Sequence, residues 1–415
     1  MPQPAMPQSA MSRLIPRVFH LLAALVLTWF GAAAQAQTFE TRATAAWVFD
    51  QSTGTVLLSK NADEPLPPAS MSKLMTIYMV FEAIADGRLQ IDETLPVSEH
   101  AMSYEGSSMF LNTNDRVTVE DLLRGTIVLS GNDSSVVLAE ALSPDGTEGG
   151  FARMMTERAR ELGMMNSTLL NSNGWPVPGH RMSMHDLGIL ADHIITDFPT
   201  FYPLFSETEF LFDGRVPSNS QNRNPMLALG IGADGLKTGH TEEAGFGLVG
   251  SAKQGDRRII FVITGLASSA ERAEEAEKIV NWAFRQFAMR QVATEGTQIA
   301  QADVWMGEAP TVGLTLGADV NLLVPTTGGA EMTAEAIYDT PIEAPIAAGQ
   351  EIGTLVITRE GLPETRVPLL ADTAVLRGGF AVRLRTAAAV LIARFAPAPV
   401  AEAATPEAPA ADGGA

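Results

Sequence analysis

The alternation of apolar and polar positions predicts that the chain begins its fold with a β-hairpin. Residues 43–49 and 55–59 have strand character and are separated by a turn at 50–54. Residues 69–84 then carry apolar side chains at helical spacing, and Gly87 ends the segment. Because this helix is apolar on most of its sides, we expect it to be buried.

The middle of the chain changes to helical periodicity and then returns to strands. Helices are predicted at 119–129, 134–142, 150–162 and 184–195. A second hairpin is predicted from strands 245–252 and 258–266 around the turn 254–256, followed by a helix at 271–288. Strands on both sides of a helical insertion predict an α+β domain, with an antiparallel sheet and a helical subdomain.

A different pattern follows from about residue 294 to residue 370. Short apolar runs at 312–316, 320–324, 336–338 and 354–358 are broken by Gly and Pro, which predicts a small all-β domain. Residues 379–395 then predict a weakly amphipathic helix with flanking arginines, suited either to an anionic membrane surface or to docking on the protein. The Pro- and Ala-rich segment 396–415 is predicted to be disordered.

Composition narrows the possible classes of function. The formal net charge of -20 argues against nucleic acid as a partner, because phosphate binding requires clustered Lys and Arg. The absence of cysteine excludes disulfides and a thiol nucleophile, and the six histidines form no metal-binding motif. We therefore expect no metal and no organic cofactor.

The first 36 residues are typical of a secretory signal peptide. Arg13 and Arg17 precede an apolar stretch at 20–30, and Ala34-Gln35-Ala36 is a small-x-small cleavage site. The alternative is a buried or membrane-anchoring helix, although the apolar stretch is short for a bilayer span. We expect export.

Two residues suggest nucleophilic chemistry. Ser70 and Lys73 form the only Ser-x-x-Lys in the chain, and this spacing puts a hydroxyl and an amine on one face at the start of a helix. An amine whose pKa is lowered by burial or by other cations can activate a serine. By itself the short pattern favours the simpler interpretation of a helix-capping Ser and a solvated Lys.

Two further motifs change this interpretation. Ser130-Gly131-Asn132 lies between two predicted helices, and Lys237-Thr238-Gly239 lies at the second hairpin. The order Ser-x-x-Lys, Ser-x-Asn, Lys-Thr-Gly is the signature of penicillin-binding proteins and serine β-lactamases. Ser220-Gln221-Asn222 also fits the middle motif, and we prefer Ser130 because of its helical surroundings.

The segments around these motifs resemble the low-molecular-mass D-alanyl-D-alanine carboxypeptidases. They are Pro67 to Thr76 (PPASMSKLMT), Glu120 to Ala139 (EDLLRGTIVLSGNDSSVVLA) and Asp234 to Ala252 (DGLKTGHTEEAGFGLVGSA). The similarity extends from about Arg42 to Phe395. It implies a β-lactamase/transpeptidase-like domain, a small all-β domain and a C-terminal amphipathic helix.

The resemblance also implies roles for the motif residues. Ser70 would attack the carbonyl of the penultimate D-Ala, Lys73 would act as its base, and Ser130 would pass a proton to the leaving amine. Asn132 would hold a substrate amide, Lys237 and Thr238 would bind the terminal carboxylate next to Gly239, and the N–H groups of Ser70 and His240 would form the oxyanion hole. Thr241 and Arg272 are further candidates for the carboxylate, with a surface role equally open for Arg272, whereas Asn173-Gly174 is interpreted as structural.

Three other functions stay open. A β-lactamase needs a carboxylate that activates the deacylating water, and residues 163–175 contain none. A peptidoglycan endopeptidase would use the same residues, and a silent wall-binding module would keep the fold without the reaction. The expected partners of the carboxypeptidase are peptidoglycan stem peptides ending in D-Ala-D-Ala and β-lactam antibiotics as covalent inhibitors.

These observations predict five segments: a signal peptide at 1–36, the peptidase domain at 37–290, the β-rich domain at 291–372, the amphipathic helix at 373–395 and the tail at 396–415. The mature protein is expected in the periplasm, attached peripherally to the inner membrane through its C-terminal helix.

Overall fold

The computed structural model describes residues 39–326, 332–380, 384 and 388. The predicted signal peptide, the tail and most of the predicted C-terminal helix lie outside the described residues. The described chain divides into two compact units. The first unit contains the described residues of Met1–Arg290, Leu323–Glu331 and Glu360–Pro363. The second unit contains those of Gln291–Leu322, Met332–Arg359 and Glu364–Ala415. The boundaries of the five predicted segments stay predictions.

The first unit is built on a five-stranded sheet with the order β2-β1-β7-β6-β5, and every neighbouring pair in it is antiparallel. Its strands are β1 (Ala45–Asp50), β2 (Thr55–Lys60), β5 (Ala233–Thr241), β6 (Gly245–Gln254) and β7 (Arg257–Leu266). A small separate sheet pairs β3 (Thr94–Pro96) with β4 (Arg116–Thr118). Both predicted hairpins are present.

The helices of the first unit lie mainly between β2 and β5 in the sequence. They are η1 (Ala69–Ser72), α2 (Lys73–Ala85), α3 (Glu99–Ser103), α4 (Val119–Ile127), α5 (Asn132–Leu142), α6 (Glu148–Glu161), α7 (Met184–Asp197), η2 (Tyr202–Ser206), η3 (Pro225–Ala228) and, after β7, α8 (Ser269–Gln286). Hydroxyl side chains begin five of them, because Ser98, Thr118, Thr147, Ser183 and Ser268 each accept an N–H three residues further on.

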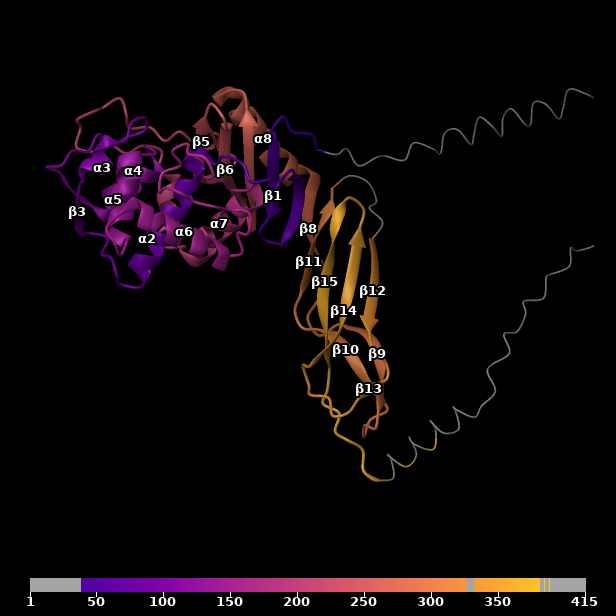
Figure 1. The fold of residues 1–415 in the computed structure, drawn as a ribbon. Coiled ribbons are helices and arrows are strands. Elements are labelled where there is room, and N and C mark those ends of the chain that lie inside the picture. Colours follow the sequence, from indigo (N-terminus) through magenta and orange to yellow (C-terminus); the bar gives the residue numbers. More distant parts are fainter. Residues whose placement is uncertain (1–38, 327–331, 381–383, 385–387, 389–415) are drawn as a thin grey trace, which may run out of the picture. The chain divides into compact units, whose positions relative to one another are not determined.

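The sheet has helices on both faces, as Figure 1 shows, and the period of two along its strands explains this arrangement. On β1, Trp47 packs into the core formed with the helical region, whereas Ala46 and Val48 pack into the core beneath α8. On β7, Ile260 and Val262 likewise face the helical region. The mixed helix and strand architecture confirms the predicted α+β class.

The second unit is mainly a six-stranded sheet with the order β12-β14-β15-β10-β9-β13. The strands from β8 onward are β8 (Phe287–Ala293), β9 (Gln298–Trp305), β10 (Thr311–Leu316), β11 (Val320–Pro325), β12 (Met332–Tyr338), β13 (Ile342–Glu343), β14 (Glu351–Arg359) and β15 (Leu362–Ala371), and β8 pairs with β11. Its core is apolar and includes Leu314, Leu322 and Leu369. The prediction of an all-β C-terminal domain is confirmed.

Several element boundaries differ from the prediction. The helix predicted from residue 69 begins as the 3-10 turn η1, and the regular helix α2 starts at Lys73. The last helix was predicted to reach residue 288 but ends at Gln286, where strand β8 begins. The pattern did not predict β3, β4, β5, β8, β9, β13 or β15.

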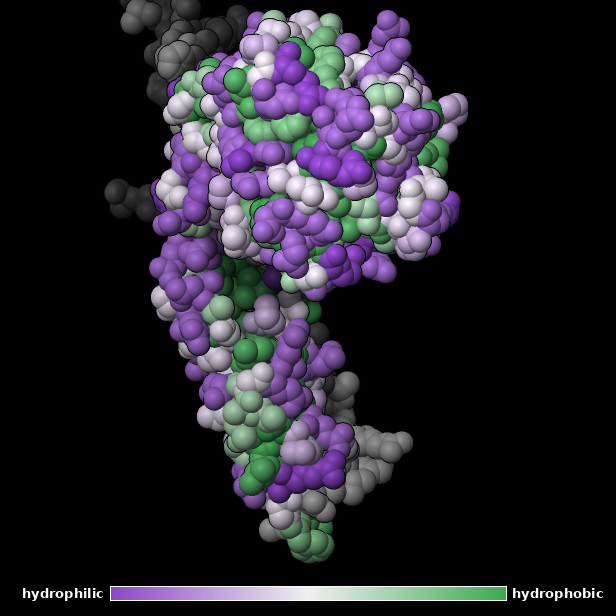
Figure 2. Space-filling view, turned by 90° about the vertical axis from the view of Figure 1, so that its left-hand side faces the viewer, coloured by the Kyte–Doolittle hydropathy of each residue, from purple (hydrophilic) through white to green (hydrophobic). Residues whose placement is uncertain are grey.

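Figure 2 shows one face of the molecule, on which hydrophilic residues predominate and hydrophobic residues are interspersed. Within the part of the chain that the structure describes, no helix is both long and apolar enough to cross a membrane.

Candidate active site

The candidate nucleophile lies on a turn that is held tightly from two sides. Ser70 is in η1, directly after Ala69, which has a positive φ of 49°. A Cβ placed on Gly174 would come within 1.9 Å of the Ala69 carbonyl oxygen, and one on Gly239 within 3.2 Å of the Ala69 Cβ. Loop 171–175 therefore approaches this turn so closely that only glycine fits at position 174, and strand β5 packs tightly against it at Gly239.

Lys73 lies one helical turn after Ser70 and its amine reaches three oxygen atoms. The Nζ atom is 3.0 Å from Ser70 Oγ, 2.8 Å from Asn132 Oδ1 and 2.6 Å from the Asn173 carbonyl oxygen. The side chain is fully buried. Burial, with a smaller contribution from the charge of Arg223, lowers the pKa of Lys73 to about 7. The solvated lysine that the short motif left open is therefore wrong.

The second motif lies where α4 gives way to α5. Ser130 is buried and has a positive φ of 61°, and Asn132 is the first residue of α5. The Asn132 Nδ2 group donates to the Glu105 carbonyl oxygen at 2.7 Å, which leaves Oδ1 to accept from Lys73. By contrast, the alternative Ser220 donates to Glu209 and Asn222 to the Glu207 carbonyl oxygen.

The third motif is in β5, where it runs beside the nucleophile. Lys237 is buried and its Nζ donates to Ser130 Oγ at 2.9 Å and to the Thr238 carbonyl oxygen at 3.2 Å. Burial and the nearby positive charges of Lys73, Arg223 and Arg272 lower its pKa. The structure thus brings the motif residues into two hydrogen-bonded groups, Ser70–Lys73–Asn132 and Ser130–Lys237. The chain joins the two groups between Ser130 and Asn132.

The side chains of the two residues that follow the motif, His240 and Thr241, make other contacts. His240 is exposed and its ring stacks on Phe246 with centroids 3.8 Å apart. Thr241 accepts from the Ala244 N–H at 3.0 Å and lines a pocket with Pro67, Pro68, Ala69 and the 174–177 segment. His180 also lines this pocket; its Nδ1 accepts from the Leu170 N–H, and burial lowers its pKa to about 4.

Two arginines add positive charge on the Lys237 side. Arg272 is buried on α8, donates to the Arg223 carbonyl oxygen at 3.3 Å and lies over the Phe246 ring. The surface role left open for Arg272 is therefore wrong. Arg223 donates to Ser107 Oγ and acts electrostatically on both Lys73 and Lys237. Lys73, Lys237 and Arg272 are buried, whereas Arg223 is exposed. Cations gathered in this way favour binding of an anion such as a carboxylate.

Sequence reasoning missed Arg223 and the role of loop 171–175. No motif marks Arg223, although it follows Ser220-Gln221-Asn222 directly. Asn173 reaches Lys73 through its main-chain carbonyl, which a residue pattern cannot reveal. Glu148 fixes this loop, because its carboxylate accepts from the Ser172 N–H at 2.9 Å and the Ser172 hydroxyl at 2.6 Å. Tyr104 and His100 contact the same carboxylate.

Two family models and several curated proteins match the sequence of this chain. A family model described as D-alanyl-D-alanine carboxypeptidase matches residues 31–268, and one described as penicillin-binding protein 5, C-terminal domain, matches residues 287–377. The D-alanyl-D-alanine carboxypeptidase DacD of Salmonella typhimurium is 36% identical over 82% of this chain and 88% of its own length.

The chain is also similar to solved structures of penicillin-binding proteins. Penicillin binding protein 5 from Haemophilus influenzae is 32% identical, with a TM-score of 0.72 over 82% of this chain and 99% of that chain. Penicillin-binding protein D2 from Listeria monocytogenes, in its ampicillin-bound form, is 30% identical, with a TM-score of 0.54 over 59% of this chain and 99% of that one.

Proposed function

The chain belongs to the D-alanyl-D-alanine carboxypeptidase family, and from this premise we propose that Ser70 is the residue acylated in its reaction. The protein is a serine-type D-Ala-D-Ala carboxypeptidase, a hydrolase of the penicillin-binding group. The family acts on peptidoglycan peptides ending in D-Ala-D-Ala and binds β-lactams. The observation that carries the assignment of Ser70 is its 3.0 Å contact with the buried amine of Lys73.

Lys73 is proposed as the general base of acylation. A base works best when its pKa is near the working pH, and the pKa of Lys73 is lowered to about 7. The neutral amine takes the Ser70 proton while Oγ forms a bond to the carbonyl carbon of the penultimate D-Ala. The N–H groups of Ser70 and His240 are proposed to stabilise the resulting oxyanion, and the close packing of Gly239 on Ala69 brings the two chain segments together.

Departure of the terminal D-Ala is assigned to the other half of the site. Ser130 is proposed to relay to the leaving amine the proton that Lys73 took from Ser70, so that Lys73 ends neutral and Ser130 keeps its hydroxyl. Lys237 holds this hydroxyl at 2.9 Å. Lys237 and Thr238 would bind the terminal carboxylate, with Arg272 and Arg223 adding positive potential. Asn132 would hold an amide of the remaining peptide, which stays on Ser70 until water hydrolyses the ester.

Slow turnover of β-lactams is expected. Glu148 is the buried carboxylate that supports loop 171–175, and it is occupied by Ser172, Tyr104 and His100. None of its described hydrogen bonds reaches Ser70 or Lys73, and residues 163–175 contain no carboxylate of the kind that activates a deacylating water in β-lactamases. The β-lactamase alternative is therefore disfavoured.

Intact-mass spectrometry after incubation with a fluorescent penicillin tests this assignment, with D-Ala release from a pentapeptide measured in parallel. A lasting adduct and D-Ala release are expected from the native chain, and neither from Ser70→Ala. Rapid turnover of the penicillin would favour a β-lactamase, and absence of any adduct would favour a binding module. Cleavage of added crosslinked peptides without release of free D-Ala from the pentapeptide would favour an endopeptidase. An adduct on another residue would overturn the assignment of Ser70.

We also propose that the mature protein is periplasmic and lies on the inner membrane. The support is the signal-like segment 1–36 and the apolar side chains of Leu376, Phe380 and Leu384, which are 62%, 82% and 61% exposed. Apolar groups next to arginines suit an anionic bilayer surface. Flotation with vesicles containing anionic lipid tests this: the chain ending at residue 372 should stay unbound, and equal binding of both forms would contradict the proposal.

A further inference from the structure

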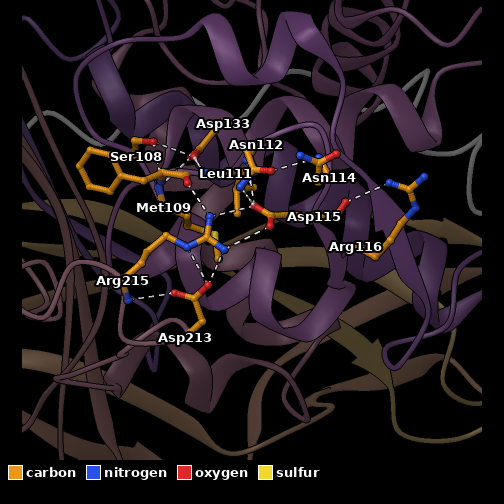
Figure 3. Close-up of polar contacts among 11 residues, drawn as sticks. Ser108, Met109, Leu111, Asn112, Asn114, Asp115, Arg116, Asp133, Asp213 and Arg215 are labelled. Carbon is orange, nitrogen blue, oxygen red and sulfur yellow. Dashed lines mark hydrogen bonds and ion pairs between the residues drawn. The ribbon is translucent and has the colours of Figure 1, made fainter.

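Arg215 joins two segments that flank the active site, 107–115 and 213–223. Its Nη1 donates to Asp115 Oδ2 at 2.8 Å and to the Phe110 carbonyl oxygen at 2.8 Å, and its Nη2 donates to Asp115 Oδ1 at 3.2 Å. Its Nε donates to Asp213 Oδ2 at 2.7 Å. Figure 3 shows the guanidinium between the two carboxylates, which belong to segments about a hundred residues apart.

The character of this junction distinguishes it from an ordinary surface ion pair. Arg215 and Asp115 are only 29% and 18% exposed, and two nitrogens meet both oxygens of Asp115. Hydrogen bonds from Arg215 lower the pKa of Asp115 and of Asp213. Bidentate, partly buried pairs of this kind fix geometry, whereas exposed single contacts contribute little.

The first of the two segments leads directly to the active site. Asp133, next to Asn132, accepts from the Ser108 hydroxyl at 2.6 Å, the Met109 N–H at 2.9 Å and the Leu111 N–H at 3.1 Å. The Asn132 N–H in turn donates to the Ser107 carbonyl oxygen at 2.7 Å. The position of Asn132 is therefore tied to the segment that Arg215 holds at Phe110 and Asp115.

The second segment reaches the same place from the other side. Asn219 donates from Nδ2 to the Ser108 carbonyl oxygen at 2.9 Å. Arg223, four residues later, donates to Ser107 Oγ. Ser107 thus contacts Asn132 through its carbonyl and Arg223 through its hydroxyl, and its own position depends on how the two segments are aligned.

The backbone conformation of Phe110 needs support of the kind that Arg215 provides. It has a positive φ of 62° although it is not glycine, a conformation that costs free energy unless its surroundings impose it. Its carbonyl oxygen is the acceptor of Arg215, and its N–H donates to Ser108 Oγ at 2.8 Å.

We propose that Arg215 is a positioning residue, which aligns the segments 107–115 and 213–223 so that Ser107 keeps Asn132 and Arg223 in place for acylation of Ser70. This inference rests on the proposed function. Arg215 itself contacts none of Ser70, Lys73 or the Lys237 amine in the described hydrogen bonds, and it acts through Ser107.

If Arg215 positions Arg223, its loss should change the pH dependence of acylation. The charges of Asp133 and Glu148 raise the pKa of Lys73, and the charge of Arg223 lowers it. The charge of Lys73 in turn lowers the pKa of Lys237 and of His180. If Arg223 moves away, the pKa of Lys73 rises. The acidic limb of the rate profile then shifts to higher pH.

The experiment compares Arg215→Ala and Arg215→Lys with Arg153→Ala. Arg153 makes a 3.0 Å pair with Asp145 on the surface, with 71% and 47% exposed side chains, and is the matched control. Arg215→Ala should slow acylation by a fluorescent penicillin about tenfold, since small displacements of positioned groups have effects of this size or larger. Its acidic limb should move to higher pH, Arg215→Lys should recover part of the rate, and Arg153→Ala should match the native chain.

Asp115→Asn separates this effect from a loss of folding. Combined with Arg215→Ala, it should add little further loss of rate, because both remove the same junction. A lower midpoint of thermal unfolding with a native acylation rate and pH profile in both variants would overturn the inference. Failure of the proposed function would appear differently, as an absence of adduct or D-Ala release from the native chain.

Discussion

The two units of the chain differ in what they bury. The first unit buries Lys73, Asp133, Glu148, Lys237 and Arg272, which gather around the site. In the described part of the second unit, the core consists of apolar side chains, and Arg359 is its buried charged residue. Burying charge opposes folding, whereas burying apolar surface favours it. The charges buried around the site therefore oppose folding of the first unit but serve its reaction, whereas the core of the second unit mainly favours folding.

The strongest test of this contrast is Lys73→Met. Loss of the general base should reduce acylation about 10²- to 10⁴-fold, the usual range for general base catalysis. The same substitution should stabilise the first unit by roughly 1–3 kcal/mol at pH 7 and below, because a buried cation is replaced by an apolar side chain.

The sign of this effect follows from linkage. The pKa of Lys73 is lowered from 10.5 to about 7 in the folded chain, so between these values the unfolded state binds more protons. Native stability should therefore rise from pH 7 toward pH 10.5, and Lys73→Met should remove that part of the slope. Denaturant unfolding at several pH values measures it, and an unchanged slope would contradict the lowered pKa.

Gly174→Ala should have the next largest effect. The added Cβ would lie 1.9 Å from the Ala69 carbonyl oxygen, and Gly174 has a φ of 82°, which disfavours alanine. Displacement of the Ser70 turn by a fraction of an ångström or more should slow acylation by about 10²-fold. Gly146→Ala is the matched control, since Gly146 also has a positive φ of 67° but has no atom within 4 Å of an added Cβ. Equal rates for both variants would argue against the close contact.

A moderate effect is expected from pH alone. Because the neutral amine of Lys73 is the reactive form, the second-order rate constant of acylation should fall about tenfold per pH unit below about pH 7. Stopped-flow labelling between pH 5 and 9 measures this profile. A rate independent of pH between 5 and 7 would show that another group acts as the base.

The smallest effect on chemistry should come from the second unit. Leu314→Ala removes a fully buried side chain of its core and should destabilise that unit by about 2–5 kcal/mol. Acylation at 25 °C should stay within about twofold of native, because Leu314 belongs to the core of the second unit and the motif residues belong to the first. Calorimetry with penicillin labelling tests both parts, and a large loss of labelling would remove the distinction between the units.

The sequence was informative where chemistry depends on side chains at short spacing. Ser70 and Lys73 are three residues apart, and the other motifs are local triplets, so each could be identified before the structure was known. The helices and hairpins were also predictable from periodicity, although their ends shifted by a few residues. The β-strands of the second unit were harder to predict, since β12 is mostly exposed and shows little alternation.

The parts that could not be predicted depend on long-range contacts. Asn173 meets Lys73 through a main-chain oxygen, and Arg223 reaches Ser107 across 116 positions of sequence. The Arg215 junction likewise unites residues that no local pattern connects. Their roles in the reaction stay predictions, as do those of the motif residues.

The three oxygen contacts of the Lys73 nitrogen also set the direction of a hydrogen bond. An ammonium group has three hydrogens and can donate to all three oxygens, whereas a neutral amine has two hydrogens and one lone pair. The Asn132 Oδ1 atom and the Asn173 carbonyl can only accept, so they take both hydrogens of the neutral form. The lone pair is then left facing Ser70, whose hydroxyl must donate to it. Loss of one proton from Lys73 thus reverses the polarity of its bond to Ser70, and the serine is aligned for deprotonation before any substrate arrives.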